Sequence, residues 1–169
     1  GLTGVDGAST EWGDYDNDGD LDLVVVGENS GYGTATIYEN EGGNSFTSVG
    51  AGLTGVEQGA SVDWGDYDRD GDLDLALVGG RQSNPPIAKV YQNEGGGTFT
   101  SIGAGLTGVK SSSVRWGDYD GDNDVDLAVT GDDSNGNPTA RIYENEGGTF
   151  TPINAGLTGV GDNIDSFSG

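Results

Sequence analysis

Residues 12–23 read W-G-D-Y-D-N-D-G-D-L-D-L, an aspartate-rich loop between a tryptophan and an apolar segment. The string W-G-D-Y-D recurs at Trp64 and Trp116, so its copies lie 52 residues apart. Two other strings recur in the same order: G-L-T-G-V starts at Gly1, Gly52, Gly105 and Gly156, and Y-[EQ]-N-E-G-G starts at Tyr38, Tyr91 and Tyr143. Recurrence of several markers at one period indicates a repeat architecture.

Each repeat predicts four short strands, because β-branched and aromatic residues are concentrated between Gly, Asn and Pro. In the second repeat these strands are 60–64, 73–78, 87–91 and 98–102, with equivalents in the other two repeats. Pro152 lies in the fourth strand of the third repeat. Since proline cannot donate a hydrogen bond to a neighbouring strand, we expect the fourth strand to be a sheet edge.

The second strand of each repeat is almost continuously apolar, which indicates a strand covered on both faces. A unit of about 50 residues with four strands and two covered faces is typical of a propeller blade. We therefore predict an all-β fold of three tandem four-stranded propeller-type blades of about 52 residues each, a β-propeller that is partial or completed by oligomerisation. A β-solenoid is the alternative, although its repeats are usually shorter.

The repeated strings set the predicted blade boundaries. Blade 1 is 1–51, blade 2 is 52–104 and blade 3 is 105–155. Residues 156–169 then open a fourth repeat or supply an assembly strand, because G-L-T-G-V returns without the tryptophan or the aspartate loop. A closed propeller needs about four to eight blades. We therefore expect the chain as given not to be a stable monomer, and its partners to be other copies of itself or further blades of a longer chain.

The aspartate loop follows the pattern D-x-D-x-D-G/N-D-x-D, with carboxylates at positions 1, 3, 5, 7 and 9. Fifteen of the 29 acidic residues lie in the three loops. Alternate carboxylates around a turn supply the oxygen ligands that Ca²⁺ prefers, and Mg²⁺ is a weaker candidate because it demands tighter octahedral geometry. We predict three Ca²⁺ sites with these ligands: Asp14, Asp16, Asp18, Asp20, Asp22, Asp66, Asp68, Asp70, Asp72, Asp74, Asp118, Asp120, Asp122, Asp124 and Asp126.

These loops are distinct from EF-hands, which carry a bidentate Glu at position 12 between two helices. Position 12 is Val25, Leu77 or Val129, each inside a predicted strand. Glycine stands at position 6 in the first two loops, and Asn123 replaces it in the third. Asn tolerates the left-handed backbone that a sharp turn needs, although less well than Gly. We therefore expect a weaker third site.

The composition excludes several function classes. The chain has 29 Asp and Glu against 6 Lys and Arg, a net charge of −23, which repels nucleic acid and anionic lipid. It has no Cys and no His, and no apolar run approaches the length of a membrane span. The common nucleophile, zinc-protease and P-loop motifs are absent. We expect no enzyme activity, no catalytic residues and no organic cofactor.

The aromatic residues of the repeat have two possible roles. We expect Trp12, Trp64 and Trp116 to fill the space between blades, and Tyr38, Tyr91 and Tyr143 to do the same with hydroxyls near the surface. Tyr15, Tyr67 and Tyr119 lie inside the loops and are candidates for ligand contact. The segments 27–33, 79–86 and 131–138 differ between repeats. We predict that these are variable loops, where binding surfaces on repeat scaffolds often lie.

The loop and its period resemble the FG-GAP/VCBS repeats of integrin-like β-propellers over residues 1–160. The resemblance implies calcium loops between the first two strands of each blade and a secreted or surface-exposed protein. We expect a structural or adhesive module of an extracellular assembly, such as a filament. The alternative is a lectin-like module that binds carbohydrate, with neutral glycans as partners because the acidic surface disfavours polyanions.

Overall fold

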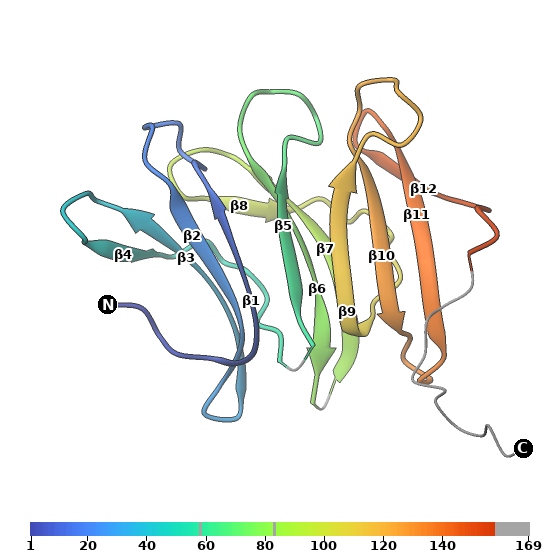
Figure 1. The fold of residues 1–169 in the computed structure, drawn as a ribbon, viewed down its shortest axis with the longest axis horizontal. Helices are drawn as coiled ribbons and strands as arrows, with labels where there is room; N and C mark the ends of the chain where they lie inside the picture. Colours follow the sequence, from blue (N-terminus) through green and yellow to red (C-terminus); the bar gives the residue numbers. More distant parts are fainter. Residues whose placement is uncertain (58, 83, 158–169) are drawn as a thin grey trace, which may run out of the picture.

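A computed structural model describes residues 1–57, 59–82 and 84–157. They form three four-stranded antiparallel sheets with the strands of each sheet in sequence order (Figure 1). Among the described residues, no helix is long and apolar enough to cross a membrane. The strands are β1 (Asp6–Gly13), β2 (Asp22–Asn29), β3 (Tyr32–Asn40) and β4 (Phe46–Val49); β5 (Ser61–Gly65), β6 (Asp74–Arg81), β7 (Asn84–Asn93) and β8 (Phe99–Ser101); and β9 (Lys110–Gly117), β10 (Asp126–Asp132), β11 (Pro138–Glu146) and β12 (Thr149–Ile153).

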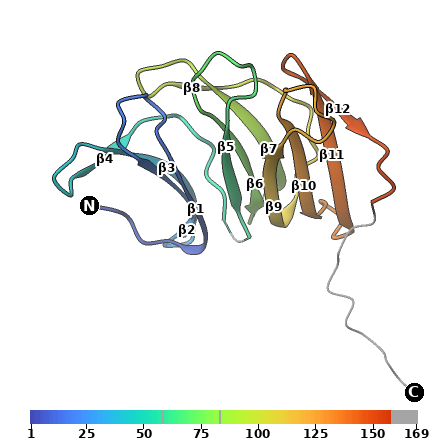
Figure 2. The ribbon, with the colours of Figure 1, turned by 45° about the horizontal axis from the view of Figure 1, so that its top comes forward.

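The three sheets stack face to face in a fan (Figures 1 and 2). Their first strands, β1, β5 and β9, lie next to one another, whereas β4, β8 and β12 form the opposite edges. Convergence on the first strand is the arrangement of propeller blades around an axis. The predicted all-β fold of tandem propeller-like blades is confirmed, and the sheets are not closed into a barrel. The sheets are called blades 1, 2 and 3 below.

The outer strand of blade 3 contains Pro152, which is paired with Tyr143 of β11 alone. The expected edge strand is therefore present. Residues 158–169, most of the predicted fourth repeat, lie outside the described residues.

The connections between the second and third strands are shorter than predicted. β2 and β3 pair as far as Asn29 and Tyr32, so that only two residues separate them. Ser30 and Gly31 both have positive φ, 52° and 83°, as a tight hairpin turn of type I′ requires. β6 ends at Arg81 and β7 begins at Asn84. The predicted variable loops 27–33 and 79–86 are thus mostly strand, and 131–138 shrinks to residues 133–137. Gly27 and Gly33, at the two ends of the first of these segments, belong to the ladder.

Two apolar cores lie between the blades, and alternate residues of β6 contribute to both. Leu75 and Leu77 pack toward blade 1, with Val24 and Val26. Ala76 and Val78 pack toward blade 3, with Leu127 and Val129 in the same core. The prediction of two covered faces is therefore confirmed for β6, whose apolar residues are all buried.

The outer blades differ in how their outward faces are covered. In β2, Leu23 and Val25 pack with Tyr38, and Val5 and Phe46 cover them. In β10, Ala128 and Thr130 are exposed, so within the described part of the chain the predicted second face of this strand is not covered.

The G-L-T-G-V string of each repeat is tied to the tyrosine of the third strand. The backbone amide of Thr54 donates to the hydroxyl of Tyr91 at 2.9 Å, and equivalent bonds join Thr3 to Tyr38 and Thr107 to Tyr143. Val56 and Val109, the last residues of the string, are fully buried in the cores between blades. Two sequence strings that recur separately therefore form one structural unit. The three tyrosines are buried as predicted, and their hydroxyls are used inside the fold.

The tryptophans of blades 2 and 3 each lie on the preceding blade. Trp64 stacks on Tyr15 with ring centroids 6.4 Å apart and planes 11° apart, and Trp116 stacks on Tyr67 at 6.5 Å and 13°. Core packing is therefore confirmed for these two tryptophans. It is wrong for Trp12, which is 55% exposed because no described residue stacks on its outer side.

Each of these tryptophans crosses the preceding blade at a glycine. A Cβ on Gly13 would stand 2.8 Å from the Trp64 ring, and one on Gly65 would stand 2.6 Å from the Trp116 ring. Those separations are too short for real side chains, so the joint requires glycine at both positions. A Cβ on Gly117, the equivalent residue of blade 3, would meet nothing within 4 Å.

We predict that Gly65→Ala destabilises a single chain by about 1–3 kcal/mol relative to Gly117→Ala, because within one chain only the first substitution places a methyl group against a tryptophan ring. Urea denaturation of the two variants in the same buffer measures the difference. Both substitutions add one methyl group at the end of a first strand, so changes in strand propensity cancel. Equal stabilities would contradict the required close approach at Gly65.

Candidate metal centre

The three aspartate loops join the first and second strands of their blades, as predicted. In each loop the carboxylates at positions 1, 3 and 5 converge, with one oxygen from each side chain within 4.8 Å of the others. The three clusters are Asp14, Asp16 and Asp18; Asp66, Asp68 and Asp70; and Asp118, Asp120 and Asp122. Their donor atoms are all carboxylate oxygens, the chemistry that suits a hard divalent cation.

Backbone amides shape each loop around the first aspartate. The two oxygens of Asp14 accept hydrogen bonds from the amides of Asp18 and Gly19, at 3.0 and 3.1 Å. Asp18 in turn accepts from the amide of Asp20 at 2.8 Å. Asn17 and Gly19 take the left-handed backbone, with φ of 61° and 95°. The turn is therefore formed by the loop itself, and it brings the alternate side chains to one side.

The third loop forms the same turn with asparagine at position 6. Asn123 has φ of 74°, and its amide donates to Asp118 at 3.2 Å, as Gly19 donates to Asp14. Asparagine thus supplies the left-handed residue that the turn needs. The weaker affinity expected of the third site stays a prediction.

The aspartate at position 9 fixes the loop to the third strand. Asp22 is 1% exposed, and its two oxygens accept from the amides of Tyr15 at 3.2 Å and Asn40 at 2.8 Å. Asp74 and Asp126 make the equivalent bonds to Tyr67 and Asn93, and to Tyr119 and Asn145. This anchoring role was not predicted, and the predicted ligand role of position 9 stays a prediction.

Burial, together with neighbouring carboxylates, raises the pKa values of several aspartates in the first two loops. Burial raises the pKa of Asp74 to about 7, and the charges of Asp68 and Asp70 contribute in the same direction. Burial also raises the pKa of Asp68, together with the charge of Asp70. The pKa of Asp22 is raised by burial and by the charges of Asp16 and Asp18. A bound divalent cation would reverse these effects, because it favours the ionised form of every carboxylate around it.

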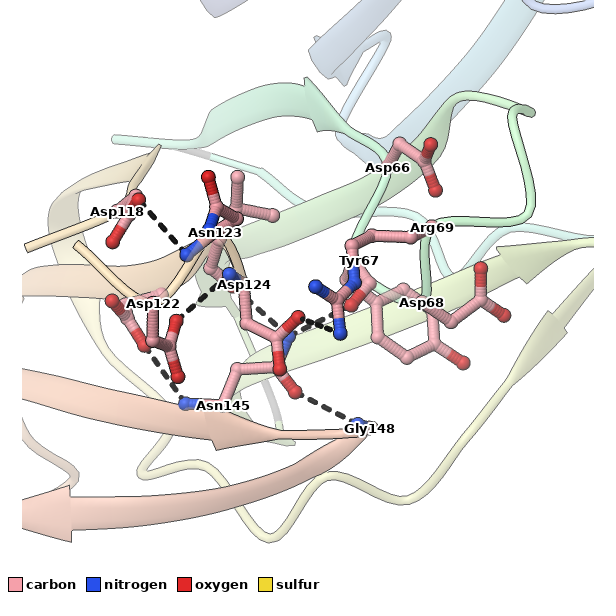
Figure 3. A network of polar contacts seen from close by, with 12 residues as sticks. Asp66, Tyr67, Asp68, Arg69, Asp118, Asp122, Asn123, Asp124, Asn145 and Gly148 are labelled. Carbon is pink, nitrogen blue, oxygen red and sulfur yellow. Dashed lines mark hydrogen bonds and ion pairs between the residues drawn. The ribbon is translucent and has the colours of Figure 1, made fainter. Parts of the chain in front are cut away.

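An asparagine from each following blade reaches the loop of the blade before it (Figure 3). The side-chain amide of Asn145 donates to the carbonyl of Tyr67 at 2.8 Å and to that of Val125 at 3.1 Å. Asn93 makes the same pair of bonds to Tyr15 and Leu73. The Y-[EQ]-N string contains these asparagines, so their recurrence was visible in the sequence, although their partner in the neighbouring blade was not.

Side chains at positions 4 and 7 link adjacent loops. The guanidinium of Arg69 lies 2.8 Å from the carboxylate of Asp124 (Figure 3), and the side-chain amide of Asn17 donates to the carboxylate of Asp72 at 2.8 Å. Position 4 of one loop therefore contacts position 7 of the next. The predicted ligand roles of Asp20, Asp72 and Asp124 stay predictions.

The loop tyrosines separate into two groups. Tyr15 and Tyr67 are 3% and 5% exposed and are covered by the next blade's tryptophan, so they are not available for the ligand contact considered for them. Tyr119 is 49% exposed. The difference follows from the position of each blade in the stack rather than from the repeat itself.

A family model described as an FG-GAP-like repeat matches residues 14–77 and 76–129. The two matches together include all three aspartate loops and more than half of the chain. No curated protein matches the chain.

We predict that Asn93→Ala costs about 1–3 kcal/mol of unfolding free energy, because the carbonyls of Tyr15 and Leu73 lose a buried donor. Asn40→Ala is the matched control, since among the described residues the side-chain amide of Asn40 donates to the carbonyl of Leu21 alone, at an exposed position. Thermal or urea denaturation compares the two variants. A loss of stability in Asn40→Ala as large as in Asn93→Ala would contradict a special role for the bond between blades.

Proposed function

Since the chain belongs to the FG-GAP-like repeat family, we propose that it is a calcium-binding repeat module with a structural or adhesive role outside the cell. The observation that carries this proposal is the triple carboxylate cluster, formed in the same way in all three loops. Repeats of this family are typical of extracellular proteins, which supports the proposed location.

Calcium fits the clusters better than the other common cations. All nearby donors are oxygens, and the sequence has no Cys or His to favour zinc or copper. Calcium accepts six to eight oxygens in flexible geometry, whereas magnesium needs a near-ideal octahedron and keeps its waters. Positions 1, 3 and 5 of each loop would hold the ion, and positions 7 and 9 are the further proposed ligands.

The proposed role of the ion is to stabilise the stack of blades. A ligand that binds only the folded state stabilises that state by mass action, by about 1.4 kcal/mol per site at ten times its dissociation constant. Here each ion would also relieve carboxylate repulsion within a loop. The loops contact one another through Arg69 and Asp124 and through Asn17 and Asp72, so ordering one loop supports the joint to the next blade.

The proposed module is not an enzyme. Its clustered acids belong to the loops, and the sequence lacks histidine, the most common general base. The alternative function, carbohydrate binding, would use the variable loops or the clefts between blades. Two residues separate β2 from β3 and two separate β6 from β7, so the loops offer less surface than the sequence predicted. Calcium-dependent assembly is therefore the function that we propose.

We predict that chelation of calcium lowers the melting temperature sharply and that added calcium restores it. The expected order of effect is calcium above magnesium above monovalent salt, because only calcium satisfies both the charge and the coordination number of the loops. Differential scanning calorimetry with a chelator and with each salt at matched ionic strength measures the effect. A melting temperature that follows ionic strength alone would contradict specific sites.

We further predict that the chain binds three calcium ions and that Asp18→Ala and Asp70→Ala each bind two. Each substitution removes one member of one carboxylate cluster. Asp6→Ala removes the same charge from an exposed position outside the loops and should leave three ions bound. Native mass spectrometry counts the ions, and calorimetric titration gives their affinities. Loss of an ion in Asp6→Ala, or no loss in the loop variants, would contradict the assigned sites.

A further inference from the structure

The two ends of the stack expose the two halves of a joint that occurs twice inside it. At the internal joints, Trp64 and Trp116 stack on Tyr15 and Tyr67 of the preceding blade and cross it at a glycine. Each of these tyrosines is at most 5% exposed. The joint therefore consists of a tryptophan from one blade and a tyrosine and glycine from the blade before it. We call this arrangement the tryptophan joint.

Blade 3 presents the receiving half without its tryptophan. Tyr119, the equivalent of Tyr15 and Tyr67, is 49% exposed, and a Cβ on Gly117 would meet nothing within 4 Å. A hollow of about 220 Å³ lies over these two residues. Its walls include Trp116, Ala128 and Ile142. A following blade covers this surface at the internal joints, and among the described residues no blade covers it here.

Blade 1 presents the inserting half. Trp12 is 55% exposed, yet it is packed against Phe46 of its own blade at 6.2 Å. Trp64 and Trp116 contact Phe99 and Phe150 of their blades at 6.0 and 5.9 Å. Trp12 is therefore supported in the same way as the tryptophans that are inserted.

We propose that Trp12 of one copy of the chain enters the hollow over Gly117 and Tyr119 of a second copy, so that copies join head to tail. The internal joints show what this hollow accepts, since the same residue types meet there twice. This inference deepens the structural role proposed above. It rests on that proposal in one respect: the loops next to the joint must be folded, as calcium binding would ensure.

The leucines of the four G-L-T-G-V strings differ in burial. Leu53 and Leu106, from the second and third G-L-T-G-V strings, pack against the cores between blades. Leu2 and Leu157, from the first and fourth strings, are each 51% exposed. The proposed joint would bring Leu2 of one copy to the end of the other that carries Leu157, and one of the two would take the position that Leu53 and Leu106 occupy at the internal joints.

The joint between copies lacks one contact of the internal joints. Position 4 of the third loop is Gly121, whereas Asn17 and Arg69 occupy this position in the other loops and contact position 7 of the next blade. Gly121 would face Asp20 of the second copy and has no side chain to bind it. Two chains of net charge −23 also repel each other. The association is therefore weaker than an internal joint and stronger in calcium and at moderate ionic strength.

Two substitutions test the joint without disturbing the fold of one copy. Trp12→Ala removes the inserting ring, which is mostly exposed. Gly117→Val fills the hollow, and in a single copy its side chain enters open space with no positive φ to strain it. Tyr32→Ala is the matched control, because Tyr32 is 77% exposed in blade 1 but lies at the β2–β3 turn.

Sedimentation velocity in calcium measures the association, and the proposal predicts the following results. The unchanged chain and Tyr32→Ala sediment above the mass of one chain, 17.2 kDa, and increasingly so with concentration. Trp12→Ala and Gly117→Val each sediment as single chains. An equal mixture of these two variants forms dimers and nothing larger, because it contains one intact tryptophan and one open hollow per pair.

Three results would overturn the proposal: an unchanged chain that stays at the mass of one copy at its highest soluble concentration, variants that associate like the unchanged chain, or a mixture that fails to dimerise. The first would mean that a second copy is not what covers the hollow. Calcium titration of the same samples separates this failure from that of the proposed function. An unchanged chain that binds three ions without associating contradicts the joint alone, and association of the unchanged chain without calcium binding contradicts the calcium role alone.

Discussion

The structure depends on the packing of one sheet against the next, because none of the four-stranded blades can bury both of its faces within itself. β6 shows this directly, since its alternate residues enter two different cores. The tryptophan joint sets the spacing at these cores: an indole crosses the preceding sheet where only glycine leaves room, and stacks on a tyrosine of the adjacent loop. The stability of such an array is approximately the sum of the blades and the contacts between neighbours.

The aspartate loops occupy the same edge of the molecule as these joints. Their carboxylates lie close enough to disfavour one another, while backbone amides hold the first and ninth positions in place. Tyr15 and Tyr67 belong to these loops and also stack on the next blade's tryptophan. Carboxylate repulsion therefore destabilises the same segments that apolar packing stabilises. A cation bound in the loops would change this balance in favour of packing, and the proposed calcium role rests on that effect.

The period of 52 residues was sufficient to predict the number of blades, their strands and the loops between the first and second strands. It could not show which neighbour a residue meets. Asn93 recurs as Asn145, but only the fold reveals that each donates to the previous blade. Trp12 matches Trp64 and Trp116 in sequence and differs from them in exposure, because exposure depends on the next sheet in space. The turn at Ser30 and Gly31 was missed since glycines flanking it suggested a longer loop.

The bonds around Tyr15 have a consequence for how the loops respond to one another. The backbone amide of Tyr15 donates to Asp22 in the first loop, and its carbonyl accepts from the side-chain amide of Asn93. The backbone amide of Asn93 donates in turn to Asp74 in the second loop. Tyr67 and Asn145 continue the same chain of bonds to Asp126. A cation that orders one loop thereby lowers the entropy cost of ordering its neighbour. Such reciprocal coupling produces positive cooperativity, so the loops would fill over a narrower range of cation concentration than independent sites would.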